Sequence, residues 1–421
     1  MSARSRLLFR TTSVAVLVAC SAAAVRNADV VPLPRLGGKA ATQMVRIALS
    51  EGKQQVRLTS LGAWEIVAAD GRAAVAITQP GERWLLSRDG NSISAMREDS
   101  RPVSAREPTL VVRPASPEGM IAVDGRRYRG AVVVSLAADG LRVVNHVTMD
   151  DYLKGVVPLE LGASSQAELA ALEAQAVTAR SYAMTHLAGT RRTFDMGAGV
   201  IDQVYGGAEA ERPVASAAVD ATSGLVILYG GQVVNAPYSS TCGGSTAEPQ
   251  DVWKTSAEPY LRRVSDLIPG TTRYYCDEAP RFRWTQTFSR DDLRRNIARY
   301  MRSIGGSGTM TSVRSVTVTD VTPAGRVATL TVETDRGTLM MRGNEMRSAL
   351  RLPSGEMLYS TYFSVDATPG RDGIETLTLH GGGNGHGVGM CQAGAIGRAR
   401  AGQDFRTILR TYYPGTTVGT I

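Results

Sequence analysis

The stretch 151–187 constrains the fold of this chain more than any other. Ser165 followed three residues later by Glu168 forms a capping box, which is a common signal at the start of a helix. Apolar residues then recur at three- and four-residue steps, namely Leu169, Leu172, Ala176, Ala179, Ala183 and Leu187. This spacing predicts a helix over 165–187 with one apolar face. Arg180 lies off that face, where it is either a surface charge or a residue that faces a site.

A single acidic residue, Glu160, precedes that helix in apolar surroundings. It follows a Val-Val-Pro run and lies between Leu159 and Leu161. Because a carboxyl group among apolar neighbours is costly to ionise, its pKa is expected to rise, which suits a general acid near neutral pH. The alternative is a solvated loop carboxylate, and the local pattern alone favours it, since most carboxyl groups have ordinary pKa values.

Further blocks along the chain resemble a known family. Besides 151–187 they are FDMGAGVIDQVYGG (194–207), AVDATSGLVILYGGQVVNAPYSSTCGG (218–244), VWKTSAEPYLRRVSD (252–266), NGHGVGMCQAGAIGRARAG (384–402) and ILRTYYPGT (408–416). In this order they resemble the stage II sporulation protein D family, which also includes the amidase-enhancer proteins. The resemblance implies a lytic transglycosylase that cuts the glycan strands of peptidoglycan, with its catalytic acid at Glu160.

The resemblance supplies one carboxylate, whereas glycoside hydrolases use two. A lytic transglycosylase needs only one, because the 6-hydroxyl of the muramic acid itself attacks the anomeric carbon. We therefore predict cleavage of the MurNAc–GlcNAc bond with 1,6-anhydro-MurNAc ends and Glu160 as acid and then base. Arg180 would pair with the lactyl carboxylate of peptide-stripped strands. The residues predicted to line the glycan groove are Gln203, Tyr205, Ser240, Thr241 and His386.

Two other classes of function stay open. The first is a non-catalytic peptidoglycan-binding activator of a cell-wall amidase. The second is a muramidase-type hydrolase that uses water, with Asp195 or Asp202 as its second carboxylate. Mass spectrometry separates hydrolysis from the lytic reaction, because only hydrolysis adds a water molecule to the product.

Block 194–207 departs from the family pattern. Several members have Cys, His and Cys here, consistent with a zinc site, but this chain has Gly197, Ile201 and Asp202. Zinc needs three or four ligands of suitable softness at fixed spacing. We therefore predict no metal at this location and no cofactor for the chain.

The cysteines allow two further predictions. In an exported protein, Cys242 and Cys276 are expected to form a disulfide. Cys391 is expected to be a small buried residue at the start of a helix. The alternative is a thiol nucleophile with His386 as its base.

Residues 1–20 are predicted to be a lipoprotein-like signal peptide. Three arginines precede a short apolar core that ends Leu-Val-Ala-Cys, so Cys20 is the lipidation candidate. Ordinary signal cleavage near Ala22 or Ala24 is the alternative. Either way the protein is expected to be exported to the cell envelope, as a lipid-anchored membrane protein or in the periplasm. The Ala-, Pro- and Gly-rich residues 21–43 are expected to be a tether.

The remaining chain is predicted to belong to the α+β class. Alternating apolar residues and regular turn signals predict a small β domain over 44–125. A mixed α/β domain of the sporulation-protein type, acting on peptidoglycan, is expected over 126–421, with one long helix after the catalytic loop. The net charge of +8 suits an acidic partner such as an anionic glycan. No basic run interleaved with aromatic residues indicates nucleic-acid binding.

Overall fold

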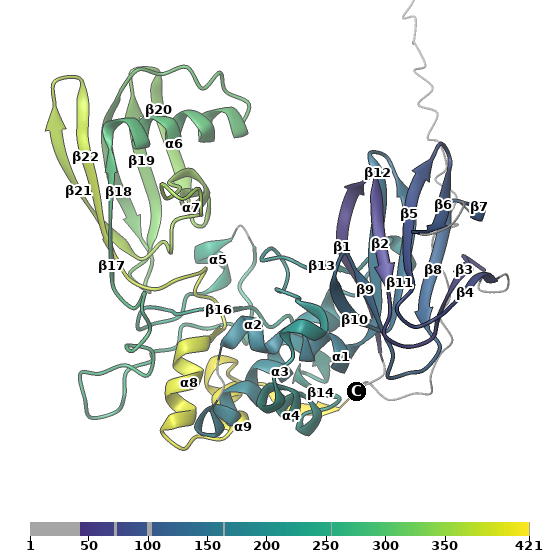
Figure 1. Cartoon of the computed structure of the whole chain (residues 1–421). Coiled ribbons are helices and arrows are strands. Elements are labelled where there is room, and N and C mark those ends of the chain that lie inside the picture. The colour runs from purple at the N-terminus through teal and green to yellow at the C-terminus, as the bar shows by residue number, and fades with distance from the viewer. Residues whose placement is uncertain (1–42, 71–73, 99–102, 163–164, 254, 421) are drawn as a thin grey trace, which may run out of the picture.

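The computed structural model describes residues 43–70, 74–98, 103–162, 165–253 and 255–420, and it confirms the α+β class (Figure 1). The predicted signal peptide, Cys20 and residues 21–42 of the predicted tether lie outside these ranges. Among the helices in the described ranges, none combines the length and the apolar character that crossing a bilayer requires.

The N-terminal unit is a sandwich of two β-sheets. Its strands are β1 (Met44–Lys53), β2 (Gln55–Thr59), β3 (Trp64–Ala68), β4 (Ala74–Thr78), β5 (Arg83–Asp89), β6 (Ser92–Arg97), β7 (Val103–Glu107), β8 (Thr109–Pro114), β9 (Met120–Val123), β10 (Arg126–Arg129), β11 (Ala131–Ala137), β12 (Gly140–Thr148) and the later β13 (Met196–Gly197). The sheet orders are β13-β1-β12-β11-β8-β3-β4 and β10-β9-β2-β5-β6-β7. Val56 and Leu58 are buried between exposed neighbours, as the alternation predicted.

The sandwich extends beyond the boundary predicted at residue 125. The hairpin of β11 and β12 lies inside the larger sheet, because β11 pairs with β8 and β12 pairs with β1. Hydrogen bonding therefore continues to Thr148, directly before the helices that carry the site.

A helical unit follows the sandwich. It contains α1 (Met149–Lys154), α2 (Val157–Leu161), α3 (Leu169–Thr185), α4 (Pro213–Ala221), α5 (Pro249–Val252), α8 (Gln392–Arg400) and α9 (Phe405–Tyr412). Its strands are β14 (Leu225–Tyr229), β15 (Gln232–Val233), β16 (Tyr238–Ser239), β23 (Met390–Cys391) and β24 (Thr417–Thr420), in sheets of order β15-β14-β24 and β16-β23.

The predicted helix over 165–187 forms, with both hydrogen bonds of the capping box at Ser165 and Glu168. It does not present a single apolar face, however, because α4, α8, α9 and β14 pack around α3. Its small alanine side chains let these elements approach on several sides, so polar residues such as Gln175 and Arg180 are buried too.

Within the chain of the helical unit lies an inserted unit with its own core. It contains β17 (Trp284–Ser289), α6 (Arg290–Ser303), β18 (Val313–Val321), β19 (Val327–Thr334), β20 (Gly337–Arg342), α7 (Glu345–Ala349), β21 (Phe363–Gly370) and β22 (Gly373–Gly381). Phe288, Leu330 and Leu377 lie in a hydrophobic cluster separate from the one shared by the sandwich and helical units. The range 126–421, predicted as one domain, thus contains two cores.

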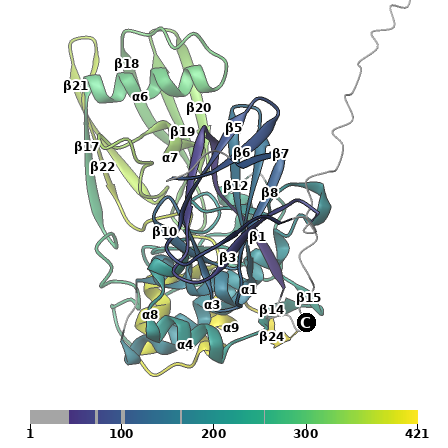
Figure 2. The ribbon, with the colours of Figure 1, turned by 45° about the vertical axis from the view of Figure 1, so that its right-hand side comes forward.

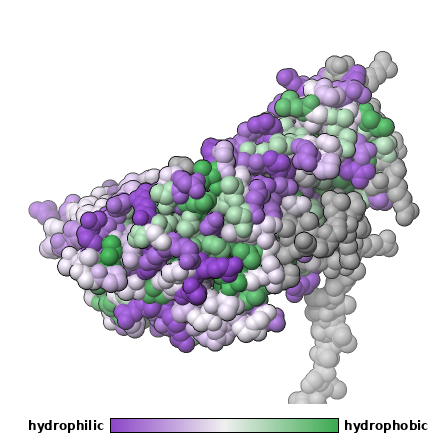
Figure 3. Space-filling view, turned by 90° about the horizontal axis from the view of Figure 1, so that it is seen from below, coloured by the Kyte–Doolittle hydropathy of each residue, from purple (hydrophilic) through white to green (hydrophobic). Residues whose placement is uncertain are grey.

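Both β-rich units rise from the same side of the helical unit (Figures 1 and 2). Seen from below, hydrophilic and hydrophobic side chains intermix on the surface, without one continuous apolar face in this view (Figure 3). After β22 the glycine-rich stretch 381–389 leads the chain back to β23, which pairs in parallel with β16. This return brings two blocks far apart in sequence next to one another.

Candidate active site

Glu160 lies in α2, a five-residue helix within the predicted catalytic loop. Pro158 falls in the first turn of α2, where its missing N–H is not needed for hydrogen bonding within the helix. Gly162 ends the helix with a φ of 67°, a left-handed conformation that favours glycine. These two residues limit α2 to little more than one turn and fix the position of Glu160.

Glu160 is partly buried and lines a pocket of about 240 Å³. Its Oε1 accepts the backbone N–H of Val204 at 2.7 Å. Burial raises the pKa of Glu160, and hydrogen bonds from Val204, Gln392 and Tyr238 oppose that rise without cancelling it. Glu160 therefore keeps its proton to a higher pH than an ordinary carboxyl group, which is the property that a general acid needs.

A chain of buried polar groups supports Glu160 from behind. Tyr152 donates its hydroxyl to Gln203 Oε1 at 3.1 Å, and Gln203 Nε2 donates to the Tyr238 hydroxyl at 3.1 Å. Because the Tyr238 oxygen accepts from Gln203, its own proton is available to the carboxyl group of Glu160, whose pKa the Tyr238 hydroxyl lowers. The network orients one donor toward the site.

Gln392, in the first turn of α8, holds the other side of α2. Its Nε2 donates to the backbone carbonyl of Glu160 at 2.9 Å and to Gln175 Oε1 on α3 at 3.3 Å. Gln392 and Tyr238 lie in two of the blocks that carry the family resemblance, but neither was predicted as a site residue. The available signal was a polar residue beside the apolar Met390 and Cys391, which buried helix starts rarely carry without a partner.

Of the predicted groove residues, Ser240 lies at the pocket. Its side chain is exposed and lines the pocket together with Glu160. Thr241, the next residue, is buried, and its backbone N–H donates to Asn384 at 3.1 Å in the glycine-rich stretch. The Ser-Ser-Thr turn and the Glu160 helix therefore meet, but only Ser240 faces the pocket.

Gln203 and Tyr205 do not line a groove, which corrects the prediction. Gln203 is fully buried in the network described above. Tyr205 is buried as well, donates its hydroxyl to Asn145 Oδ1 at 2.8 Å, and packs its ring against those of Tyr128 and Tyr152. Both residues support the wall behind Glu160 instead of contacting a ligand.

Arg180 does not face the site either. Its side chain is buried and forms an ion pair with Asp150 at 2.8 Å. It also donates to the backbone carbonyl of Leu225 at 3.1 Å. Since its guanidinium is committed to α1 and β14, it has no donor directed at a muramic acid carboxylate, and the predicted role is replaced by a structural one.

His386 is held away from the carboxyl group of Glu160. Its Nδ1 accepts the N–H of Val388 at 3.1 Å, and its ring packs against Trp253 with centroids 4.9 Å apart. Burial, and then the charges of Arg347 and Arg326, lower the pKa of His386 to about 3. His386 is therefore neutral, and it is not among the residues that line the Glu160 pocket.

The alternative of a Cys391–His386 dyad finds no geometric basis. Cys391 is fully buried, and its Sγ accepts the N–H of Gly394 at 3.3 Å as the cap of α8. Burial raises the pKa of the Cys391 thiol. A buried, neutral thiol is a poor nucleophile.

The family's zinc ligands have no equivalent at 197, 201 and 202. Gly197 offers only its backbone N–H, which donates to Asp202 Oδ2 at 2.8 Å, and the side chain of Ile201 is 92% exposed. One carboxylate with two such neighbours does not fit a zinc ion.

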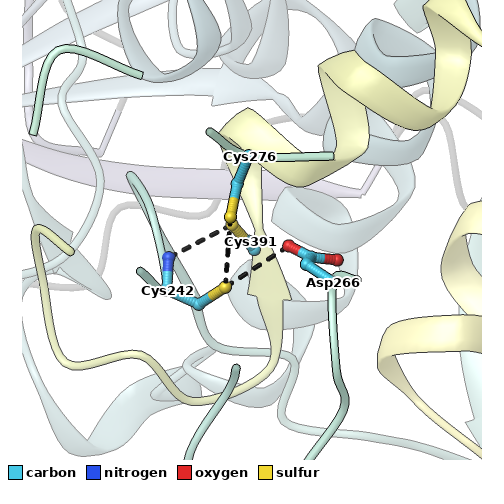
Figure 4. A group of neighbouring side chains, drawn as sticks. All are labelled: Cys242, Asp266, Cys276 and Cys391. Carbon is cyan, nitrogen blue, oxygen red and sulfur yellow. Dashed lines mark hydrogen bonds between the residues drawn. The ribbon is translucent and has the colours of Figure 1, made fainter. Parts of the chain in front are cut away.

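Cys242 and Cys276 are not joined by a disulfide, contrary to the prediction. Their sulfur atoms lie 3.7 Å apart, and both are free thiols, as is Cys391. With Asp266 the three cysteines form one buried group, which we call the cysteine cluster (Figure 4).

The second carboxylate of the hydrolase alternative is also placed differently. Asp195 is buried in an ion pair with Arg46 at 2.7 Å, and neither it nor Asp202 lines the pocket. The acidic residue that does so is Glu278, which pairs with Arg400 at 2.7 Å on the pocket wall.

Comparison with known proteins agrees with this arrangement. The family model of stage II sporulation protein, SpoIID, matches residues 137–229, which carry Glu160, α3 and Gln203. An uncharacterized protein of Brachyspira hyodysenteriae is 31% identical over 298 residues, covering 70% of this chain and 73% of that protein. The chain belongs to the SpoIID family. The resemblance stated from the sequence is thereby confirmed.

Two relatives of this SpoIID-family protein carry descriptive names. Stage II sporulation protein D of Bacillus subtilis is 27% identical over 291 residues, covering 65% of this chain and 75% of that protein. The amidase enhancer of Bacillus subtilis is 28% identical over 343 residues, and the match covers 72% of this chain but 45% of the enhancer. A separate model, a domain of unknown function named DUF8618, matches 267–389, which contains the inserted unit.

Proposed function

We propose that this SpoIID-family protein acts in the cell wall as a lytic transglycosylase on peptidoglycan glycan strands, with Glu160 as its general acid and base. The observation that carries the proposal is a residue, Glu160, that lines a pocket and whose carboxyl group has a raised pKa. Most buried carboxyl groups pair with a cation, whereas the Glu160 carboxyl group accepts a backbone N–H, that of Val204, and the groups that lower its pKa are all neutral. Such a group is suited to exchange a proton with a ligand.

The reaction needs two successive proton transfers at the same carboxyl group. Glu160 gives its proton to the glycosidic oxygen as the bond from that oxygen to the anomeric carbon breaks. The 6-hydroxyl of the same MurNAc then attacks the anomeric carbon, and the Glu160 carboxylate takes the hydroxyl proton. Glu160 returns to its acid form, no water is consumed, and the product is a 1,6-anhydro end.

Several residues around Glu160 would each assist a different part of this reaction. The N–H of Val204 and the hydroxyl of Tyr238 stabilise the carboxylate that forms when the proton leaves. Ser240 offers a hydroxyl to the sugar, and Arg400 is the cation that lines the pocket. The guanidinium of Arg400 is already paired with Glu168 at 2.6 Å and with Glu278 at 2.7 Å, so no described cation is assigned to a lactyl carboxylate.

A second candidate function is the activation of an amidase, since one relative is named an amidase enhancer. In that case the pocket would bind glycan without cleaving it. Purified protein would then release no fragments, would increase fragment release by an added amidase, and would do so equally with Glu160 replaced.

The decisive comparison uses purified wild type and Glu160→Gln on peptide-stripped glycan strands, with products weighed by mass spectrometry. Loss of a general acid should slow cleavage by about 10²- to 10⁴-fold. Glu375→Gln, the same chemical change on the surface strand β22, is the matched control and should keep full activity. Equal activity of wild type and Glu160→Gln would rule out the catalytic proposal.

A further inference from the structure

The cysteine cluster is a second polar centre, independent of any reaction at Glu160. One ligand atom from each of Cys242, Asp266, Cys276 and Cys391 lies within 4.8 Å of every other, and all four residues are buried. Cys242 Sγ is 3.7 Å from Cys276 Sγ and 3.3 Å from Asp266 Oδ2. Figure 4 shows the four side chains converging on one point from different segments.

We propose that Cys242, Cys276, Cys391 and Asp266 bind one zinc ion with a structural role. A tetrahedral zinc with bonds of about 2.3 Å to sulfur and about 2.0 Å to oxygen holds two sulfurs about 3.8 Å apart and a sulfur and an oxygen about 3.5 Å apart. The two distances given above match this geometry, whereas a disulfide requires about 2.05 Å between its sulfurs. A disulfide between any two of the three cysteines would also leave the third as a buried thiol beside the buried carboxylate of Asp266.

Backbone N–H groups surround the sulfur atoms of the cysteine cluster, as expected for ligands that carry negative charge. Cys391 Sγ accepts the N–H groups of Cys242 at 3.2 Å and Gly394 at 3.3 Å, and Cys242 Sγ accepts that of Gly244 at 3.4 Å. Backbone N–H donors stabilise thiolates, so the sulfurs are prepared for their metal-bound form.

Asp266 is oriented in the same way. Its Oδ1 accepts the hydroxyl of Tyr412 at 2.7 Å and the guanidinium of Arg398 at 3.0 Å. This leaves Oδ2 directed at the sulfurs. Hydrogen bonding of one carboxylate oxygen by outer residues, with the other facing the metal, is the usual support of a carboxylate ligand.

The charges also balance with zinc in place. Three thiolates and one carboxylate exceed the charge of the ion by two, and two buried arginines supply that amount. Arg398 contacts Asp266, and Arg326 donates Nη2 to the carbonyl of Cys242 at 2.9 Å. Nε and Nη1 of Arg326 have no hydrogen-bond partner among the described residues, so its burial is explained best by negative charge close by.

Ligand type and spacing select the metal. Three thiolates favour a soft or borderline ion over calcium or magnesium, which prefer oxygen. An iron–sulfur cluster holds its cysteines on the outside of several atoms, and ligand atoms within 4.8 Å of one another leave room for a single ion. Four buried protein ligands leave no open position, so the site is structural and not catalytic.

The ion would cross-link a segment that contains no helix or strand. Residues 255–283, between α5 and β17, contain isolated bridges but no helix or strand. Asp266 and Cys276 come from this segment, while Cys242 and Cys391 belong to the turn after β16 and to the start of α8. Cys276 also lines the Glu160 pocket, so the ion would stabilise one of its walls.

The test is the metal content of the full-length chain, purified without chelator or reductant and measured by inductively coupled plasma mass spectrometry. We expect about one zinc per chain, retained in Glu160→Gln, because binding does not depend on the proposed reaction. Cys276→Ser should lose most of the zinc. Cys20→Ser removes the one cysteine outside the cluster and is the matched control, which should keep it.

Cobalt gives a readout that does not require a variant to fold. Wild-type chain that is refolded with cobalt should show the visible bands of a tetrahedral ion and thiolate-to-cobalt absorption in the near ultraviolet. A zinc-free chain without this spectrum would overturn the proposal. So would a mass two hydrogens below the fully reduced value, stoichiometric iron or copper instead of zinc, or full zinc content in Cys276→Ser.

Discussion

Two polar centres meet at the start of α8, and they differ in their access to solvent. Cys391, which caps the helix, belongs to the closed cysteine cluster. Gln392, the next residue, holds α2 and thereby the open pocket of Glu160. Cys276 has a place in both, since it is a member of the cluster and lines the pocket.

The comparison shows that a buried carboxyl group can serve either proton transfer or the stability of the fold, depending on its hydrogen-bond partners. The Glu160 carboxyl group is bound by neutral donors, so its proton is held by the cost of ionising in a poorly solvated place. Burial raises the pKa of Asp266 as well, but there the hydroxyl of Tyr412 and the guanidinium of Arg398 act to lower it. A buried acid without a cation suits proton transfer, whereas one with a cation suits cross-linking of the fold.

The largest expected effect is on the closed side. Asp266→Ala leaves the guanidinium of Arg398 buried without its ion-pair partner, which should lower the free energy of unfolding by about 3–5 kcal/mol. Urea unfolding followed by circular dichroism measures the loss. Asp277→Ala, in the same segment, breaks an ion pair with the exposed Arg273 and should cost much less. Equal losses of unfolding free energy in the two variants would mean that the buried ion pair of Asp266 contributes no more than the exposed ion pair of Asp277.

Next in size is an effect on the open side. Tyr238→Phe removes a hydroxyl group that favours the charged form of Glu160, so the maximal cleavage rate should fall about tenfold. That hydroxyl lowers the pKa of Glu160, and its removal should therefore raise this pKa. The alkaline fall in rate, which marks the loss of the proton from Glu160, should then move to higher pH than in wild type.

Rate measured against pH for wild type and Tyr238→Phe checks both expectations. Tyr229→Phe, at the more exposed end of β14, is the matched control and should reproduce the wild-type profile. A tenfold slower variant with an unshifted profile would mean that Tyr238 acts on packing alone and not on the charge of Glu160.

A smaller effect concerns stability and has the opposite sign to that of Asp266→Ala. Because the pKa of Glu160 is raised in the folded state, the protein loses stability as pH rises through that value, where a partly buried carboxyl group must ionise. Glu160→Gln carries no charge and keeps an acceptor for Val204. It should therefore be more stable than wild type in mildly alkaline buffer, with the gain vanishing below about pH 4, where wild type is protonated in both states. A less stable variant at alkaline pH would contradict a raised pKa.

Sequence patterns predicted the apolar neighbours of Glu160 but not the polar residues that support it. The Val-Val-Pro-Leu-Glu-Leu run predicted a loop that holds Glu160 among apolar residues, where the short helix α2 forms instead. The capping box at Ser165 predicted the helix that follows, and that helix formed. The signals were local, since caps and prolines act within a few residues. The family resemblance singled out Glu160 among the other acidic residues.

The remaining assignments depended on tertiary contacts, which the sequence does not display. Arg180 was expected to be exposed because an isolated helix would expose it, but Asp150 and the ring of elements around α3 make it a core residue. The pairing expected for Cys242 and Cys276 followed from their being the two cysteines in that part of a chain expected to be exported. Cys391 joined them only because β23 pairs with β16, a contact across about 150 residues of chain.

The smallest effect is expected at Glu278, and it decides between one and two carboxylates. Glu278 stands in the pocket wall, where a hydrolase would need its second acid, but its side chain is 68% exposed and paired with Arg400. A lytic reaction does not use it, so Glu278→Gln should change the cleavage rate by no more than about twofold, as for other surface ion pairs. If Glu278→Gln instead failed as completely as Glu160→Gln, and the wild-type product carried an added water, the pocket would belong to a hydrolase. The pocket would then hold two catalytic acids, Glu160 and Glu278, in place of the single acid that is compared here with the cysteine cluster.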